Sequence, residues 1–338
     1  MVSFDLSKPL HIIPVGRVAV DFNPTDYNKP LSESCNFNKY VGGSPANIAV
    51  GMARLGNRVG FLARVSDDSF GTFVLDFFKK EGIDISHIRR CEHGEKIGLT
   101  FTEILSPKES SILMYREGAA DLALSVMDVD ETYIEKTACL LISGTALCTS
   151  PTREASLKAL TIANRLGIPV VFDCDYRAYT WKSREEIAIY TSLVAERSDI
   201  IMGSREEFDL METLLDLAGT DDASADYWLS KKAEICVIKH GKEGSRAYSR
   251  TECYDVKPFP VKALKGFGGG DGYASAFLHG LMSGKSLPEA LEMGSASAAM
   301  LVASHACSSD MPDEPSLFAF LKEKKEEFGS PLSAVDRR

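Results

Sequence analysis

Short apolar runs rich in β-branched residues alternate along this chain with longer amphipathic segments. The apolar runs have the length of buried strands and lie at 12–20, 59–65, 140–142, 168–172 and 199–202. After each run, apolar residues recur with helical spacing, over 45–55, 69–80, 151–166, 183–197 and 206–218. This alternation predicts βαβ units, and therefore a three-layer α/β fold with helices on both faces of a mainly parallel central sheet.

Capping residues support several of these helices. Ser183 and Glu186 have the spacing of a capping box, and Pro45 suits a first helical turn. Gly56 and Gly167 stand where a helix C-terminus favours glycine. The predicted helix ends therefore rest on local chemistry as well as on periodicity.

Two segments, at about 21–41 and 96–116, interrupt the alternation with short strand-like pieces and no helix between them. We interpret them as a small second sheet inserted into one large α/β domain over 1–330, with a C-terminal tail over 331–338. The exposed edges of such a sheet need cover from a ligand, a partner or the main domain. A lid over the carboxyl ends of the main strands, with a homodimer through the lid as a further option, meets that need.

The composition favours a folded globular protein over a membrane protein or a protein that binds nucleic acid. The 338 residues are 44% hydrophobic and 25% charged, which is typical of a folded globular chain. A net charge of −10 disfavours binding to nucleic acid or to anionic membranes. No apolar run is long enough to cross a membrane, and Met1 to Leu10 lacks the apolar core of a signal peptide, so we expect a cytoplasmic protein.

The cysteines and histidines show no pattern of a metal site. Eight cysteines are scattered without a Cys-x-x-Cys pair, mostly in apolar runs, and the six histidines have no ligand-like spacing. We expect the cysteines to be reduced and to pack as small apolar residues, and the histidines to be structural.

The glycine-rich segment 266–272 carries the strongest chemical signal. A helical pattern of apolar residues begins directly after it, so its glycines allow backbone N–H groups to converge at a helix N-terminus and hold an anion. Asp271 in this loop would be repelled by phosphate unless it takes a proton from a substrate hydroxyl, as a general base does. Alternatively, Asp271 caps the helix and the glycines form a tight turn.

A second glycine pair, Gly42 and Gly43, precedes another predicted helix, and Asn47 stands in its first turn. Together with Gly268, Gly269, Gly270 and Asp271, this segment makes the chain resemble the ribokinase family of carbohydrate kinases over nearly its whole length. The resemblance implies a ribokinase-like fold.

The same resemblance implies specific roles. Asp271 would be the catalytic base, and Gly268 to Gly270 the anion hole for the transferred phosphoryl group. Asp21, Gly42, Gly43 and Asn47 would bind the sugar. The expected cofactors are ATP and Mg²⁺, and dependence on a monovalent cation stays open. The resemblance places nucleotide contacts at Asp175, Ser204, Glu207, Lys239, Gly241, Gly244 and Ser295.

Glu207 would also organise Mg²⁺ through water. Ser204 stands where the family has Asn, and Ser204-x-x-Glu207 is equally a capping box. Both interpretations of Glu207 stay open.

Segments 142–147, 173–181 and 203–208 resemble the sugar-acid branch of the family. Lys265, which stands where many relatives have Asp, is a departure that this branch shares. Arg177 and Arg116 could grip a carboxylate through paired hydrogen bonds. Alternatively, Arg177 pairs with a neighbouring aspartate and Arg116 is a solvated surface charge.

We therefore expect an ATP-dependent kinase that phosphorylates the terminal (6-) hydroxyl of a sugar acid. The alternatives are a 2-keto-3-deoxygluconate kinase or a fructokinase of the same family, a non-catalytic sugar sensor and, more remotely, a nicotinamide-dependent dehydrogenase.

Overall fold

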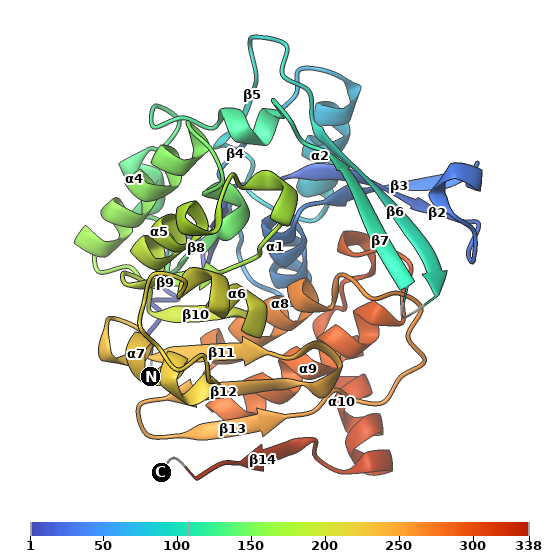
Figure 1. Cartoon of the computed structure of the whole chain (residues 1–338). Coiled ribbons are helices and arrows are strands. Elements are labelled where there is room, and N and C mark those ends of the chain that lie inside the picture. Colours follow the sequence, from blue (N-terminus) through green and yellow to red (C-terminus); the bar gives the residue numbers. More distant parts are fainter. Residues whose placement is uncertain (1, 107–108, 337–338) are drawn as a thin grey trace. The chain divides into compact units, whose positions relative to one another are not determined.

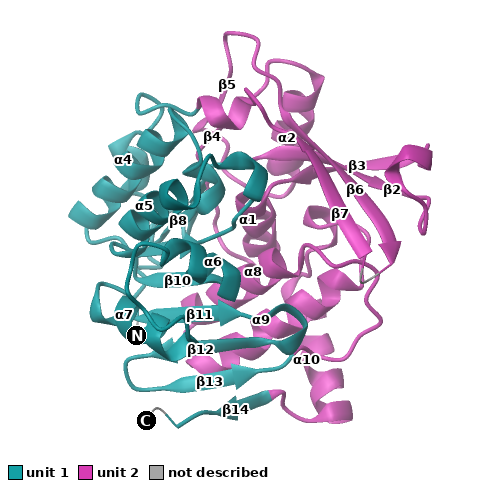
Figure 2. Ribbon diagram, in the orientation of Figure 1, with its two compact units in different colours: residues 1–16, 124–257, 332–338 teal, residues 17–123, 258–331 magenta. Residues whose placement is uncertain are grey.

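A computed structural model describes residues 2–106 and 109–336 of the chain. These residues form two compact units, each built from segments far apart in the sequence (Figure 2). Unit 1 comprises 1–16, 124–257 and 332–338, and unit 2 comprises 17–123 and 258–331.

The described strands of unit 1 form one eight-stranded sheet (Figure 1). In spatial order they are β1 (Ile13–Val15), β8 (Leu140–Ser143), β9 (Val170–Asp173), β10 (Ile200–Ser204), β11 (Ile235–Lys239), β12 (Ser245–Ser249), β13 (Cys253–Val256) and β14 (Leu332–Ala334). The first five are parallel, and the last three continue the sheet antiparallel. Strands β8 and β9 are buried along their whole length, as expected for parallel strands covered on both faces.

The helices of unit 1 are α3 (Glu131–Ile134), α4 (Thr152–Arg165), α5 (Arg184–Ala195), α6 (Arg205–Met211) and α7 (Asp221–Ser230). Helices α4 and α5 begin and end within two residues of the predicted positions, whereas α3 and α7 were not predicted. Helix α6 ends seven residues before the predicted end at 218. Directly after the helix, the buried carboxylate of Glu212 accepts hydrogen bonds from Ser224 Oγ (2.7 Å) and Trp228 Nε1 (2.8 Å) of α7.

Unit 2 contains the small sheet predicted from 21–41 and 96–116. Its spatial order is β3 (Phe37–Gly42), β2 (Ala19–Pro24), β6 (Gly98–Ser106) and β7 (Glu109–Tyr115). The run 12–20, predicted as one strand, is divided between β1 and β2, because Gly16 between them has a φ of 121° that no strand tolerates. The predicted α/β class, with a large mainly parallel sheet and a separate small one, is confirmed.

A second departure concerns the run 59–65. It does not join the large sheet: β4 (Ala63–Val65) pairs in parallel with β5 (Ile88–Arg90), and α2 (Ser69–Lys80) connects the two. The pattern identified a βαβ unit correctly but not the sheet to which it belongs. The segment expected as a C-terminal tail also contributes β14, which pairs with β13.

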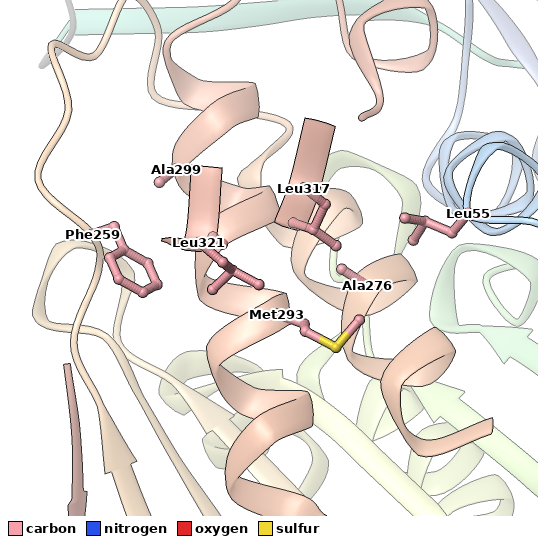
Figure 3. Packing of buried hydrophobic residues seen from close by; sticks show 8 residues of the cluster. Leu55, Phe259, Ala276, Met293, Ala299, Leu317 and Leu321 are labelled. Carbon is pink, nitrogen blue, oxygen red and sulfur yellow. The ribbon is translucent and has the colours of Figure 1, made fainter. Parts of the chain in front are cut away.

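The remaining long helices of unit 2 are α1 (Ser44–Arg54), α8 (Gly269–Met282), α9 (Leu287–Val302) and α10 (Glu314–Phe328). Side chains from α8, α9 and α10 meet in a buried cluster that includes Ala276, Met293, Leu317 and Leu321 (Figure 3). Helices α8 and α9 pack closely, since a Cβ on Gly280 would lie 3.0 Å from Ala290. This packing fixes the helix whose N-terminus is the glycine-rich loop.

All eight cysteines lie in the described part of the chain as free thiols, and Cys35 alone among them is exposed. Burial raises the pKa of Cys139 and Cys174 above the ordinary thiol value. Within the described ranges, no helix is long and apolar enough to cross a membrane.

Thiol reactivity tests this packing. At mildly alkaline pH, Ellman's reagent should modify one thiol rapidly in the native protein, because the buried thiols are not accessible to it. All eight should react after denaturation. The substitution Cys35→Ser should abolish the fast phase, and any fast-reacting thiol in the folded variant would contradict the fold.

Candidate active site

Helix α8 begins at Gly269 with an open N-terminus. Gly268 is its N-cap residue in the left-handed conformation (φ 86°), and no side chain caps this end of the 14-residue helix. The first backbone N–H groups of a helix have no acceptor within it, and the helix dipole makes this end positive. Such a helix end is suited to an anion, and the role of glycines 268–270 as an anion hole stays a prediction.

Asp271 stands in the first turn of α8, with its carboxylate held from two sides. Ser44 Oγ donates to its Oδ1 and Asn47 Nδ2 donates to its Oδ2, both at 2.7 Å. These donors come from the first turn of α1, more than 220 residues away in the chain. The structure thus brings together the two glycine motifs that the sequence analysis paired.

Gly43 allows this approach because it has a φ of 98°, and a Cβ there would lie 2.7 Å from the carbonyl oxygen of Arg17. Gly42 leaves room for Asp21, since a Cβ on Gly42 would lie 2.1 Å from the carboxyl carbon of that residue. Asp21 follows β1 and lies on β2, as the motif requires, with its carboxylate against the Gly42–Gly43 turn.

The side-chain amide of Asn47 has an oxygen atom that can accept a further hydrogen bond. Its side chain is buried, its Nδ2 is used by Asp271, and its Oδ1 has no hydrogen-bond partner among the described residues. A buried acceptor without a partner is costly, so a hydroxyl donor at this position would be bound favourably. The amide can therefore link a substrate hydroxyl to the Asp271 carboxylate.

Ser44 is a contact that the sequence analysis did not single out. It lies between the glycine pair and Asn47, is buried, and holds the same carboxylate as Asn47. Ser44 could have been identified from the sequence, because it is a polar residue in the same helical turn as Asn47, which was already predicted to bind a ligand.

Arg116 is not a solvated surface charge. It is buried, and its Nε and Nη2 donate to Asp121 Oδ2 at 3.0 and 2.6 Å. Arg17, which the sequence analysis did not identify, is also buried and donates from Nη2 to Thr100 Oγ1 at 3.0 Å. Thr100 is the register partner of Asp21 across β2 and β6, so this guanidinium lies at the sugar-side motif.

In unit 1, the predicted nucleotide residues follow the carboxyl ends of neighbouring parallel strands. Asp175 comes after β9 with a φ of 34°, accepts from Ser143 Oγ at 3.1 Å and pairs with Arg177 Nη2 at 2.7 Å. Arg177 also donates to the Tyr176 carbonyl oxygen. Arg177 therefore forms an ion pair with the neighbouring Asp175, which is one of the two alternatives that the sequence left open.

Ser204 and Glu207 form the predicted capping box at the start of α6. Ser204 Oγ accepts from the Glu207 N–H at 3.2 Å, and Glu207 Oε2 accepts from the Ser204 N–H at 2.6 Å. Glu207 Oε1 accepts from the Tyr176 N–H at 2.7 Å, so both carboxylate oxygens stabilise the backbone. The capping interpretation of Glu207 is confirmed, and its magnesium role stays a prediction.

Lys239 ends β11 and lies 3.4 Å from Asp173 at the end of β9. Burial would lower the pKa of Lys239, but the carboxylates of Asp173 and Glu207 outweigh burial and raise it. The lysine is therefore a fixed positive charge at the carboxyl edge of the sheet.

Three further predicted nucleotide residues have less distinctive surroundings. Gly244 has a φ of 103°, and a Cβ there would lie 2.1 Å from the Val256 carbonyl oxygen, so the turn into β12 requires glycine. Gly241 also has positive φ, and Ser295 is buried in α9. In 2–106 and 109–336, no group of three or more His, Cys, Asp or Glu side chains is arranged to hold a metal ion.

Comparison with known proteins agrees with this geometry. The family model described as pfkB family carbohydrate kinase matches residues 10–314. A curated relative, 5-dehydro-2-deoxygluconokinase of Clostridium perfringens (strain ATCC 13124), is 62% identical over 333 residues, which cover 98% of each chain.

Solved structures share the fold at lower identity. A putative ribokinase II from E. coli, in complex with ATP and Mg²⁺, has a TM-score of 0.84 and 23% identity, covering 93% of this chain and 99% of its own. A fructokinase double mutant from Vibrio cholerae O395, with fructose, ADP and potassium bound, has a TM-score of 0.80 and 20% identity over the same shares. With its two glycine motifs joined at Asp271, the chain belongs to the pfkB family of carbohydrate kinases.

Proposed function

We propose that this kinase transfers the γ-phosphoryl group of ATP to the 6-hydroxyl of 5-dehydro-2-deoxy-D-gluconate, a sugar acid of myo-inositol catabolism. The observation that carries the reaction type is the Asp271 carboxylate, held by Ser44 and Asn47 at the open N-terminus of α8. The choice of substrate rests on the 62% identity, over nearly the full length of both chains, to a curated 5-dehydro-2-deoxygluconokinase.

Asp271 acts as the general base. Its carboxylate accepts the proton of the sugar hydroxyl as the oxygen attacks phosphorus, while the amides of 268–270 face the charge on the moving phosphoryl group. Asn47 Oδ1 accepts a hydrogen bond from a sugar hydroxyl, and Asp21 beside Gly42 accepts another. These contacts orient the sugar so that its terminal hydroxyl faces the base.

ATP and Mg²⁺ suit the residues present. The open helix N-terminus fits a phosphate group, and Mg²⁺ usually reaches such sites with nucleotide phosphates and water rather than in a cage of protein ligands. When bound, Mg²⁺ neutralises phosphate charge. We assign nucleotide binding to the unit 1 residues at the strand ends and to Ser295, with any contact of Glu207 to Mg²⁺ made through water, since backbone N–H groups already use both carboxylate oxygens.

A carboxylate on the substrate needs a positive partner. Arg116 and Arg177 remain the candidates predicted for it, and the buried Arg17 joins them because it lies at the sugar-side motif. The Vibrio cholerae fructokinase structure contains potassium, and the need of this kinase for a monovalent cation is taken up in the next subsection.

We also propose that the enzyme works in the cytoplasm as a homodimer through the small sheet. Edge strand β7 exposes Ile112, Leu113 and Tyr115, with 38%, 46% and 61% of their surface accessible. An apolar edge strand invites pairing with another strand, and a second copy of the chain would cover it.

The role of Asp271 is tested by Asp271→Asn. This change should lower kcat by about 10³-fold, because an amide cannot accept the hydroxyl proton. ATP affinity, measured by calorimetry, should change little. Asp76→Asn, on an exposed part of α2, is the matched control. Near-normal turnover in Asp271→Asn would refute the assignment.

The role of Ser44 is tested by Ser44→Ala. Loss of one hydrogen bond to a carboxylate should lower kcat by about tenfold. The KM for ATP should stay close to its original value, since the amides of α8 are intact. A variant with unchanged kcat would show that Asn47 alone positions the base.

The substrate is tested by a panel of sugar acids and neutral sugars, with ADP release as the readout. We expect the highest kcat/KM for 5-dehydro-2-deoxy-D-gluconate, then for related acids such as 2-keto-3-deoxygluconate. A preference for fructose or ribose would refute the acid assignment while leaving the kinase assignment intact.

A further inference from the structure

Lys265 is a buried charge beside the anion site. Only 1% of its surface is exposed, and it is among the largest fully buried side chains of the described chain. Burying an ammonium group is costly unless its hydrogen bonds and charge are compensated. No carboxylate within the described residues lies within ion-pair distance of its Nζ. The buried charge of Lys265 is therefore not compensated by a salt bridge.

The ammonium group is held by a backbone carbonyl, a sulfur and an aromatic face. Nζ donates to the carbonyl oxygen of Ala306, lies 3.7 Å from Cys307 Sγ, and lies 5.2 Å from the centroid of the Phe267 ring. The backbone N–H groups of Leu264 and Lys265 both donate to the Val302 carbonyl oxygen. The lysine therefore joins the segment after α9 to the glycine-rich loop.

This junction lies directly against the anion site. A Cβ on Gly268 would lie 2.5 Å from Cys307 Sγ and 3.8 Å from Lys265 Cε. Burial raises the pKa of the Cys307 thiol to about 12, with Asp271 and Asp21 adding to the rise and Lys265 opposing it. The two carboxylates of the sugar site and the lysine charge therefore act on the same small region.

We propose that Lys265 is a positioning residue whose ammonium group serves as a built-in cation. It fixes Ala306 and Cys307 against the loop 266–270 and places a positive charge behind the amides that receive the phosphoryl group. A soluble K⁺ or NH₄⁺ ion bound to a backbone carbonyl would supply the same charge, but a lysine supplies it permanently. The kinase therefore needs no monovalent cation.

A purely structural role predicts something different. Methionine has nearly the length and volume of lysine and is not charged, so it would fill the same space without the cost of a buried ammonium group. If packing were the only function of Lys265, Lys265→Met would preserve both stability and turnover. If the charge matters, turnover falls while the fold is retained.

The experiment compares wild type, Lys265→Met, Lys265→Ala and the control Lys262→Met, which changes an exposed lysine three residues earlier. Each protein is assayed in tetramethylammonium chloride, whose cation is too large for a lysine-sized cavity, and in the chlorides of potassium, ammonium and ethylammonium at equal ionic strength. The assay uses the sugar acid that wild type phosphorylates best. The proposal rests on the kinase function, and a wrong substrate would show in wild type rather than in the ratio of variant to wild type.

Wild type and Lys262→Met should be equally active in all four salts. Lys265→Met should lose about 100-fold in kcat with a smaller change in the KM for ATP, and no salt should restore it because its side chain fills the space. Lys265→Ala should lose as much, and ammonium or ethylammonium should restore at least about tenfold by entering the cavity.

Three results would overturn the proposal. They are near-normal kcat in Lys265→Met, a folded Lys265→Ala that responds to no small cation, and a wild type that requires potassium. The last needs no variant, so the proposal stays testable even if both substitutions at Lys265 prevent folding.

Discussion

The site depends on one interaction, the pair of hydrogen bonds from Ser44 and Asn47 to the two oxygens of Asp271. Each partner stands in the first turn of a helix, and the two helices come from opposite ends of the chain. The carboxylate is therefore oriented by α1 as much as by α8. Because both donors also lie next to the Gly42–Gly43 turn, the proposed proton acceptor, Asp271, and the proposed sugar ligand, Asn47, form one hydrogen-bonded network.

Small residues make this network geometrically possible. A Cβ on Gly51 of α1 would lie 2.5 Å from Ser275 Oγ of α8, and one on Gly272 would lie 2.6 Å from Leu301 of α9. Close helix contacts of this kind leave little freedom for α8 to slide or rotate. The same packing that buries the core cluster (Figure 3) thus fixes the position of the α8 N-terminus, where we propose that the phosphoryl group is received.

Periodicity and capping signals were enough to predict most elements, because they report local burial and local backbone chemistry. Helix α2 begins and ends at the predicted residues, Ser69 and Lys80. The run 59–65 shows the limit of this approach: its apolar residues indicate a buried strand, but which sheet a strand joins is decided by tertiary contacts. Gly16 likewise divides a continuous apolar run through its backbone conformation, which hydropathy does not record.

Buried charges were the least predictable part of the site. Arg17 was not identified from the sequence, Arg116 was left open between a carboxylate ligand and a surface charge, and Lys265 was noted only as a difference from relatives. The net charge of −10 gives no sign of local positive groups. All three are buried in unit 2, the unit that holds Asp21 and Asp271. Two carboxylates and the anion of a substrate in one small region would repel one another without compensation. Buried cations would therefore offset these charges in the proposed reaction, and an acidic protein can bind anions because the local balance of charge decides.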